Sequence, residues 1–162
     1  MNQLEILRNK DKIIDYVLKD EALVDLLRPK KEEDFIPEDL INDGIYNYYK
    51  VPRTQEEAGI YLTVAADIPT RHEPNSLTKN IEYTITVITH DSLMEVKGNR
   101  ANRNDLIGSR IDFLFNEHED FGIGKLHLVT SDEGVLDTGQ PFRVMKFDVI
   151  DFNNNRNPKR KW

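Results

Sequence analysis

The stretch IEYTITVITH, residues 81–90, constrains the fold of this chain more than any other. Apolar and polar residues alternate along it, with Ile81, Tyr83, Ile85 and Val87 on one side and Glu82, Thr84 and Thr86 on the other. Successive side chains of a β-strand point to opposite faces, so this alternation predicts a strand with one face in a core. It is the clearest strand in the sequence.

Three further segments predict strands. Residues 58–66 alternate Ile60, Leu62 and Val64 with Tyr61 and Thr63, residues 124–129 contain Leu126 and Leu128, and residues 142–152 place Met145, Phe147 and Val149 on one face. Two polar segments, 67–80 with its two prolines and 131–141, are predicted to be long loops.

A helix is predicted from about residue 102 to residue 115. Asn102 or Asn104 can cap its start, and Asp105 in its first turn complements the helix dipole. Its apolar stripe consists of Ile107, Ile111, Leu114 and Phe115, while Leu106 and Phe113 lie on an adjoining flank. The apolar surface is therefore wider than one contact with a sheet requires.

Gly108 lies inside this predicted helix. A glycine there costs about 1 kcal/mol of helix propensity relative to alanine. A close approach of the helix backbone to another element would explain it.

The first 52 residues have a different pattern. Residues 3–18 have apolar positions at helical spacing, and Asp20 can cap a second, shorter helix that Pro29 stops. These helices need a surface to pack against, either the chain's own sheet or another copy. A short helix can open at Pro37, and Ile45, Tyr46, Tyr48 and Tyr49 form a cluster that suits a core edge, which we favour, or an interface.

Together these segments predict an α+β fold. Its core is a small, mostly antiparallel sheet in the order β-β-α-β-β, packed by one central helix and preceded by an N-terminal helical arm. We expect three parts: residues 1–57 as helices and an irregular segment on the core, residues 58–152 as the core domain, and residues 153–162 as a basic, flexible tail.

Composition narrows the class of protein. A chain of 162 residues with 38% hydrophobic and 31% charged residues is expected to form one soluble domain, with no apolar run that spans a bilayer and no visible secretion signal. The absence of cysteine excludes disulfides and thiolate metal sites. The net charge of −7 argues against a general nucleic-acid binder.

The segment RNPKRKW, residues 156–162, departs from this acidic balance. Its basic residues are Arg156, Lys159, Arg160 and Lys161. They are candidates for contact with nucleic-acid phosphate or with an acidic neighbouring protein. The alternative is a solvated end without a partner, which is the common behaviour of termini.

The stretch NEHEDFGIGKLHL, residues 116–128, concentrates acids and histidines around two glycines. Glu117, His118, Glu119 and Asp120 are consecutive, so their side chains diverge and do not converge on one ion. His127 could approach His118 from the next strand. The favoured reading is a polar turn from helix to strand, with Gly122 and Gly124 giving the backbone its freedom, rather than a metal or acid–base site.

Catalytic templates give little support for an enzyme. The chain has no nucleophile-elbow motif and no phosphate-loop motif, and no cofactor is expected. One arrangement stays open as an alternative: Glu82, Asp148 and Asp151, with Lys125 or Lys146, as a metal-dependent nuclease centre on a sheet. We favour charged residues on a solvated sheet face, and therefore a protein that acts through interactions and is not an enzyme.

The pattern resembles the tail terminators and related head–tail neck proteins of tailed bacteriophages. The resemblance covers residues 58–152 and rests on the alternating strand, the helix NRNDLIGSRIDFLF, the Gly-x-Gly turn and the closing strand FRVMKFDVIDF.

This resemblance implies a structural virion protein that is assembled in the bacterial host cytoplasm. Copies would form a ring, commonly of six, that caps the tail tube, joins it to the head and contacts other neck and tail-tube proteins. DNA would pass through the channel without specific binding, and an acidic wall would suit that passage. Exposed loops at 67–80 and 130–141 would meet the rings above and below.

Candidate residues for the contact between subunits are Leu106, Arg110, Phe113, Tyr48 and Tyr49. One flank of the helix would cover its own sheet and the other a neighbouring copy, as in a heterologous closed ring. A head-closure or adaptor protein of the same neck, a small phage nuclease and a monomeric binding module are the alternatives.

Overall fold

The structure, a computed structural model, describes residues 3–52, 58–69 and 77–152. Within these residues the helices are α1 (Gln3–Lys19), α2 (Glu21–Leu27) and α3 (Arg103–Phe115), with short 3-10 helices η1 (Pro37–Leu40) and η2 (Asp91–Leu93). The strands are β1 (Ile45–Tyr46), β2 (Ile60–Asp67), β3 (Thr78–Thr89), β4 (Ile123–Val135) and β5 (Pro141–Phe152). None of the described helices combines the length and apolar character that a membrane crossing needs.

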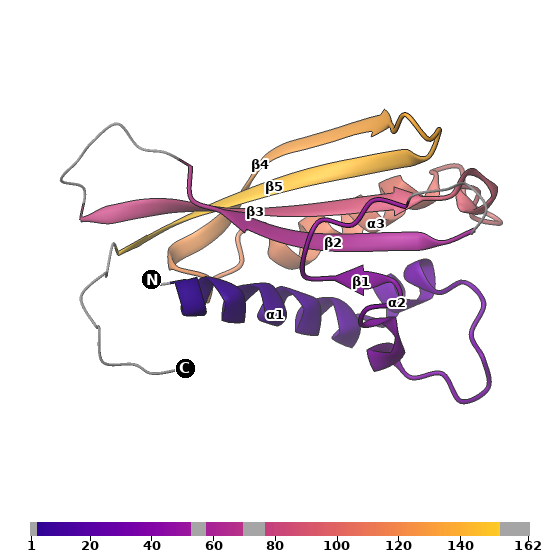
Figure 1. Cartoon of the computed structure of the whole chain (residues 1–162), viewed down its shortest axis with the longest axis horizontal. Helices are drawn as coiled ribbons and strands as arrows, with labels where there is room; N and C mark the ends of the chain where they lie inside the picture. The colour runs from indigo at the N-terminus through magenta and orange to yellow at the C-terminus, as the bar shows by residue number, and fades with distance from the viewer. Residues whose placement is uncertain (1–2, 53–57, 70–76, 153–162) are drawn as a thin grey trace.

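The strands form one sheet in the order β1-β2-β3-β5-β4 (Figure 1). β2, β3, β5 and β4 pair antiparallel, and β1 adds two residues parallel to β2. The predicted α+β class with a mostly antiparallel sheet is confirmed. β3 lies at the centre of the sheet, as its alternating pattern suggests.

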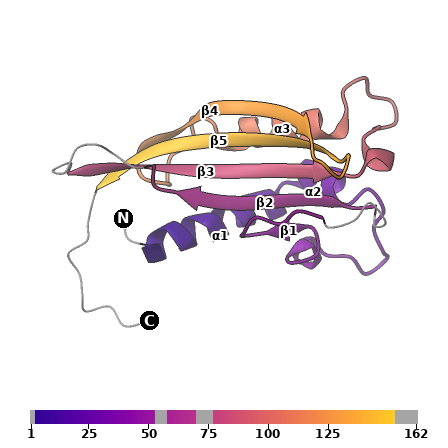
Figure 2. The same ribbon diagram turned by 45° about the horizontal axis from the view of Figure 1, so that its top comes forward.

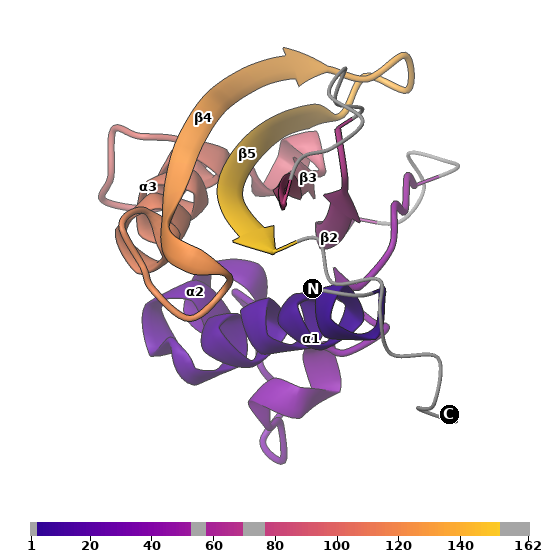
Figure 3. The ribbon, with the colours of Figure 1, turned by 90° about the vertical axis from the view of Figure 1, so that its left-hand side faces the viewer.

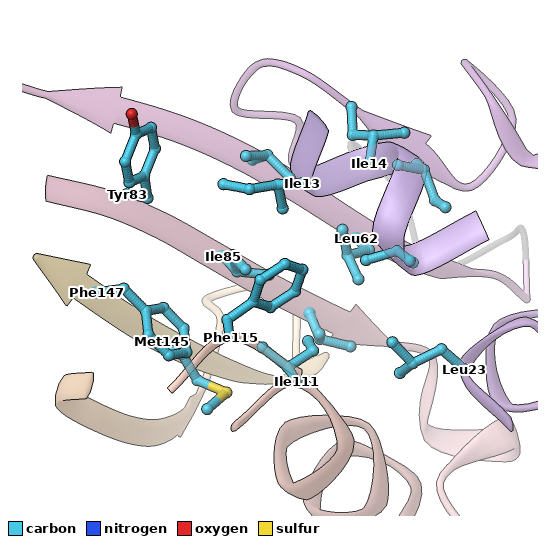
Figure 4. Packing of buried hydrophobic residues seen from close by; sticks show 14 of the residues in the cluster. Ile13, Ile14, Leu23, Leu62, Tyr83, Ile85, Ile111, Phe115, Met145 and Phe147 are labelled. Atoms are coloured by element: carbon cyan, nitrogen blue, oxygen red, sulfur yellow. The ribbon is translucent and has the colours of Figure 1, made fainter. Parts of the chain in front are cut away.

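The helices pack on one face of this curved sheet (Figures 2 and 3). Apolar residues of α1, α2 and α3 join the inward residues of the strands in one cluster (Figure 4). Members that are almost fully buried include Ile13, Leu23, Leu62, Tyr83, Phe115 and Phe147. The N-terminal helices therefore pack against the chain's own sheet.

Short-range signals placed the helix ends correctly. Asp20 is the N-cap of α2, and its carboxylate accepts a 2.9 Å hydrogen bond from the Leu23 amide. Asn102 caps α3 in the same way through the Asp105 amide, also at 2.9 Å. Pro37 opens η1, as its fixed φ favours.

Two predicted loops were too long, and one strand was missed. β4 continues through residues 131–135, where Ser131 pairs with Met145 and Glu133 with Arg143, so only residues 136–140 form the turn to β5. β3 likewise already begins at Thr78. β4 is an edge strand held by backbone pairing with exposed polar side chains, so it lacks the alternation that marks β3. β1 is too short to show any pattern.

Gly108, inside α3, lies where another part of the chain approaches the helix closely, as its low helix propensity suggested. The side chain of Arg143, from β5, crosses the helix at this point: a Cβ on Gly108 would lie 2.5 Å from Arg143 Cδ. Arg143 is held there by Asp105 on α3, by Glu133 at 3.0 Å and by the Ser131 hydroxyl at 3.1 Å. Glycine therefore allows a charged side chain to lie between helix and sheet.

We expect Gly108→Ala to behave differently in two backgrounds. When Arg143 is replaced by alanine, Gly108→Ala should raise the free energy of unfolding by about 1 kcal/mol, the usual propensity gain. In the presence of Arg143 that gain should be lost, because the new methyl group displaces the guanidinium. Denaturant unfolding of the unmodified chain, Gly108→Ala, Arg143→Ala and the double variant gives the four free energies. An equal effect of Gly108→Ala in both backgrounds would contradict this role of Gly108.

Candidate subunit interface

The outer flank of α3 carries the most exposed aromatic side chain of the described residues. The stripe of Ile107, Ile111 and Phe115 is buried against the sheet, which turns Phe113 outward with 73% of its surface exposed. Leu106, on the same flank, is half-buried. Aromatic side chains are enriched where proteins contact one another, so this flank is the candidate surface for a contact with another protein.

Arg110 lies beside Phe113, with its guanidinium carbon 4.7 Å from the centre of the ring. The same guanidinium forms a bidentate pair with Asp20: Nε donates to Oδ1 at 3.1 Å and Nη2 donates to Oδ2 at 2.6 Å. The charge of Arg110 is thus already neutralised within the chain. What this flank offers a neighbour is mainly the apolar ring of Phe113.

Asp20 performs two tasks at one position. Its carboxylate, only 7% exposed, caps α2 and also binds Arg110, which links the start of α2 to the middle of α3. The hydrogen bonds from Arg110, followed by those from the Leu23 and Ala22 amides and by the charge of Arg110, lower the pKa of Asp20 against the opposing effect of burial.

This lowered pKa predicts how stability depends on pH. A carboxyl group whose pKa is lower in the folded chain stabilises it above the unfolded pKa, and that stabilisation is lost as pH falls through the folded pKa. Asp20→Asn keeps a capping oxygen and removes the charge, so it should destabilise the fold at neutral pH. The deficit should vanish in acid.

Asp20→Ala removes the cap as well. Its free energy of unfolding should therefore stay about 1 kcal/mol below that of the unmodified chain even in acid. Urea unfolding across acidic to neutral pH measures both variants. A deficit of Asp20→Asn that is the same at every pH would show that the charge of Asp20 does not contribute.

The tyrosine cluster lies on the other face of the sheet. Tyr46 is buried at the core edge, as we favoured, and its ring stacks on Tyr61 of β2 at 6.3 Å between centroids. Tyr48 and Tyr49 do not share that burial, since 49% and 60% of their surfaces are exposed. Lys50 covers the Tyr46 ring at 4.7 Å. These tyrosines and Phe113 therefore form separate exposed surfaces on opposite faces of the sheet.

The stretch 116–128 is a turn from helix to strand, as favoured. α3 ends at Phe115, and the backbone takes positive φ at Glu117, Asp120 and Gly124 before and within the first residues of β4. Gly122 passes so close to β5 that a Cβ would lie 2.8 Å from the Ile150 carbonyl oxygen.

The two histidines of this stretch have different partners. The His118 ring packs on Tyr16 at 4.9 Å between centroids, whereas His127 Nδ1 lies 3.1 Å from a Glu117 carboxylate oxygen. The turn also closes part of the outer edge of β4: the Glu117 amide donates to the Leu126 carbonyl, and the Leu126 amide donates to the His118 carbonyl, both at 2.8 Å.

The structure brings together part of the alternative nuclease set. Glu82 pairs with Lys146 at 3.0 Å and lies opposite Asp148 in the register of β3 and β5. Asp151 falls on the other face of β5, and Lys125 instead pairs with Glu117. In the part of the chain that the structure describes, no group of three or more His, Cys, Asp or Glu residues could hold a metal ion.

Sequence reasoning missed two interactions that organise this flank, the pairing of Asp20 with Arg110 and the placement of Arg143 on α3. Asp20 is 90 positions from Arg110, and no local pattern links them. Arg143 left a trace, because the costly Gly108 indicated that something lies on α3. The basic candidates Arg156, Lys159, Arg160 and Lys161 lie outside the described residues.

Comparison with known families places most of this fold in one group. A family model described as YomW matches residues 20–149, from the cap of α2 to the second half of β5. No curated protein matches the chain. The matched part contains α3, the central strands and the candidate interface residues. The chain therefore belongs to the YomW family, which is phage-derived.

Proposed function

We propose that this chain is a structural subunit of the phage neck, a tail terminator whose copies form a ring that caps the tail tube and joins it to the head. The observation that carries the proposal is the exposed Phe113 on α3, in a chain whose family is phage-derived. A contact between subunits would bury this aromatic side chain, and the burial of its apolar surface would stabilise the contact.

The placement of the exposed residues supports a ring. In a closed ring each subunit uses two different patches, one for each neighbour. Phe113 and the pair Tyr48 and Tyr49 lie on opposite faces of the sheet, so one copy can present Phe113 while the next presents its tyrosines. The resemblance to neck proteins suggests six copies, with other neck and tail-tube proteins above and below.

The net charge of −7 suits a channel for DNA, because an acidic wall repels phosphate and does not retain it. The proposed location is the virion, after assembly in the bacterial host cytoplasm. A head-closure or adaptor protein would use the same kinds of contact. Copurification with tail tubes supports the terminator, and copurification with filled heads supports the adaptor.

The first test is the mass of the purified protein by light scattering over a range of concentrations. A ring, or monomers that close into one as concentration rises, is expected. Phe113→Asp should leave folded monomers, and its free energy of unfolding should change by no more than about 0.5 kcal/mol because the ring is exposed. Val135→Asp is the matched control, since Val135 is 65% exposed but lies at the end of β4.

The outcomes separate the readings. If Phe113→Asp assembles like the unmodified chain, this flank of α3 is not the contact. If Phe113→Asp becomes insoluble, the aromatic side chain of Phe113 is needed for folding and is not an interface residue. A mass of one chain at every concentration contradicts self-assembly of the free protein and favours a monomeric binding module.

The nuclease alternative makes a different prediction. A centre built on Glu82, Asp148 and Lys146 would need a divalent ion, and Lys146 would have to release Glu82. We expect titration with Mn²⁺, followed by calorimetry, to give no saturable binding, and Glu82→Gln to leave that result unchanged. Saturable binding that Glu82→Gln abolishes would overturn the structural role in favour of the nuclease.

A further inference from the structure

A small cleft lies between α1 and the segment that leads from η1 into β1. It is lined by three isoleucines, Ile14, Ile41 and Ile45, which we call its floor, and by the polar residues Asp11, Asp15, Asn42 and Asn47, which we call its rim. Its volume is about 200 Å³, which is smaller than the roughly 300–1,000 Å³ of typical small-molecule sites. The cleft suits one large side chain of a peptide better than a cofactor.

The rim of the cleft is acidic. Asp11 and Asp15 are one helical turn apart and exposed, and neither carboxylate lies within 4.0 Å of a cationic nitrogen of a described residue. Lys10, next to Asp11 in sequence, does not line the cleft. Burial lowers its pKa, and the charge of Asp11 acts in the opposite direction. An apolar floor with unpaired carboxylates on its rim is complementary to a basic segment that carries an apolar or aromatic side chain.

The chain itself contains such a segment. Residues 153–162 read NNNRNPKRKW, with four cations and the single tryptophan of the sequence, Trp162. An indole flanked by Lys161, Arg160 and Lys159 provides both parts of the complement. The indole ring matches the isoleucines in apolar character, and the neighbouring cations match the rim carboxylates in charge.

The geometry of the fold puts the cleft within reach of this segment in the same copy. Asn9 of α1 donates a 2.8 Å hydrogen bond to the Tyr83 hydroxyl, and Tyr83 pairs with Phe147 of β5. Phe152 lies about 17 Å further along β5, and Ile14 about 8 Å further along α1. Even in opposite directions these displacements add to about 25 Å, and the offset of about 10 Å between packed layers, which runs across that direction, brings the distance to about 27 Å. Residues 153–162 can span about 33 Å when extended.

We propose that residues 153–162 dock in this cleft of their own chain, with Trp162 on the isoleucine floor and the preceding cations beside Asp11 and Asp15. The contact covers the basic segment until another partner displaces it. It goes beyond the proposed function, because it exists whether or not the chain forms a ring.

Trp162 makes the test direct, because no other tryptophan contributes to the emission. In the full chain we expect blue-shifted tryptophan emission and weak quenching by acrylamide, both independent of protein concentration. Asp11→Asn with Asp15→Asn should weaken docking by about fivefold and shift the emission to the red. Added salt should act in the same direction. Ile41→Ser, at a floor position that is 46% exposed, should also release Trp162 without unfolding the chain.

The matched control is Asp132→Asn with Asp137→Asn. It removes the same charge from exposed positions near the opposite edge of the sheet and should leave the emission unchanged. Solvent-exposed emission in the unmodified chain, or an equal red shift in the control, would overturn the proposal. A blue shift that appears only as concentration rises would show that the segment docks on a second copy, which also contradicts docking within one chain.

Ring formation is measured separately by light scattering. If the unmodified chain forms the subunit ring but shows solvent-exposed tryptophan emission, the docking is rejected and the ring is not. Monomers that retain the blue shift reject the ring alone.

Discussion

Burial of one face of β3 is the constraint on which the rest of this fold depends. Ile81, Tyr83, Ile85 and Val87 are each no more than 1% exposed, in the middle of the sheet, and all three α-helices pack over that face. Tyr83 also brings a hydroxyl group into the core, where burial raises its pKa to about 12 despite the hydrogen bond from Asn9. Asn9 donates in addition to the Phe121 carbonyl, so one polar side chain connects α1, the central strand and the turn after α3. The position of the outer flank of α3, and with it of Phe113, follows from this packing.

The elements with strong local signals could be predicted from the sequence. The alternation in β3, the caps at Asp20 and Asn102 and the stripe of α3 each lie within a few residues, and short-range physics decides them. The limits of β4 could not be predicted, because an edge strand is defined by its partner and not by burial of its own side chains. The pairing of Asp20 with Arg110 depends on helices that meet only in the folded chain. Gly108 is an intermediate case: its helix cost revealed that something lies close, but not that it is Arg143.

The candidate interface shows the same division. Sequence periodicity placed Phe113 off the buried stripe, and the structure leaves it exposed beside Arg110. The exposure of Tyr48 and Tyr49 could not be derived, because the same aromatic composition also suits a core edge, where Tyr46 does lie. What distinguishes them is the pairing of β1 with β2, which fixes Tyr46 against Tyr61 and leaves the next tyrosines outside. A two-residue strand thus decides which aromatic rings are available to a neighbour.

The edge formed by β4 limits how copies of this chain can meet. Its first half is closed by hydrogen bonds from the turn after α3, and the remainder carries Asp132 and Glu133. Glu133 is paired with Arg143, but two copies approaching edge to edge would bring their Asp132 carboxylates together, and this repulsion opposes an extended intermolecular sheet. Natural sheets use the same device against fibrous aggregation, so the β4 edge opposes uncontrolled strand pairing between copies when the protein is concentrated.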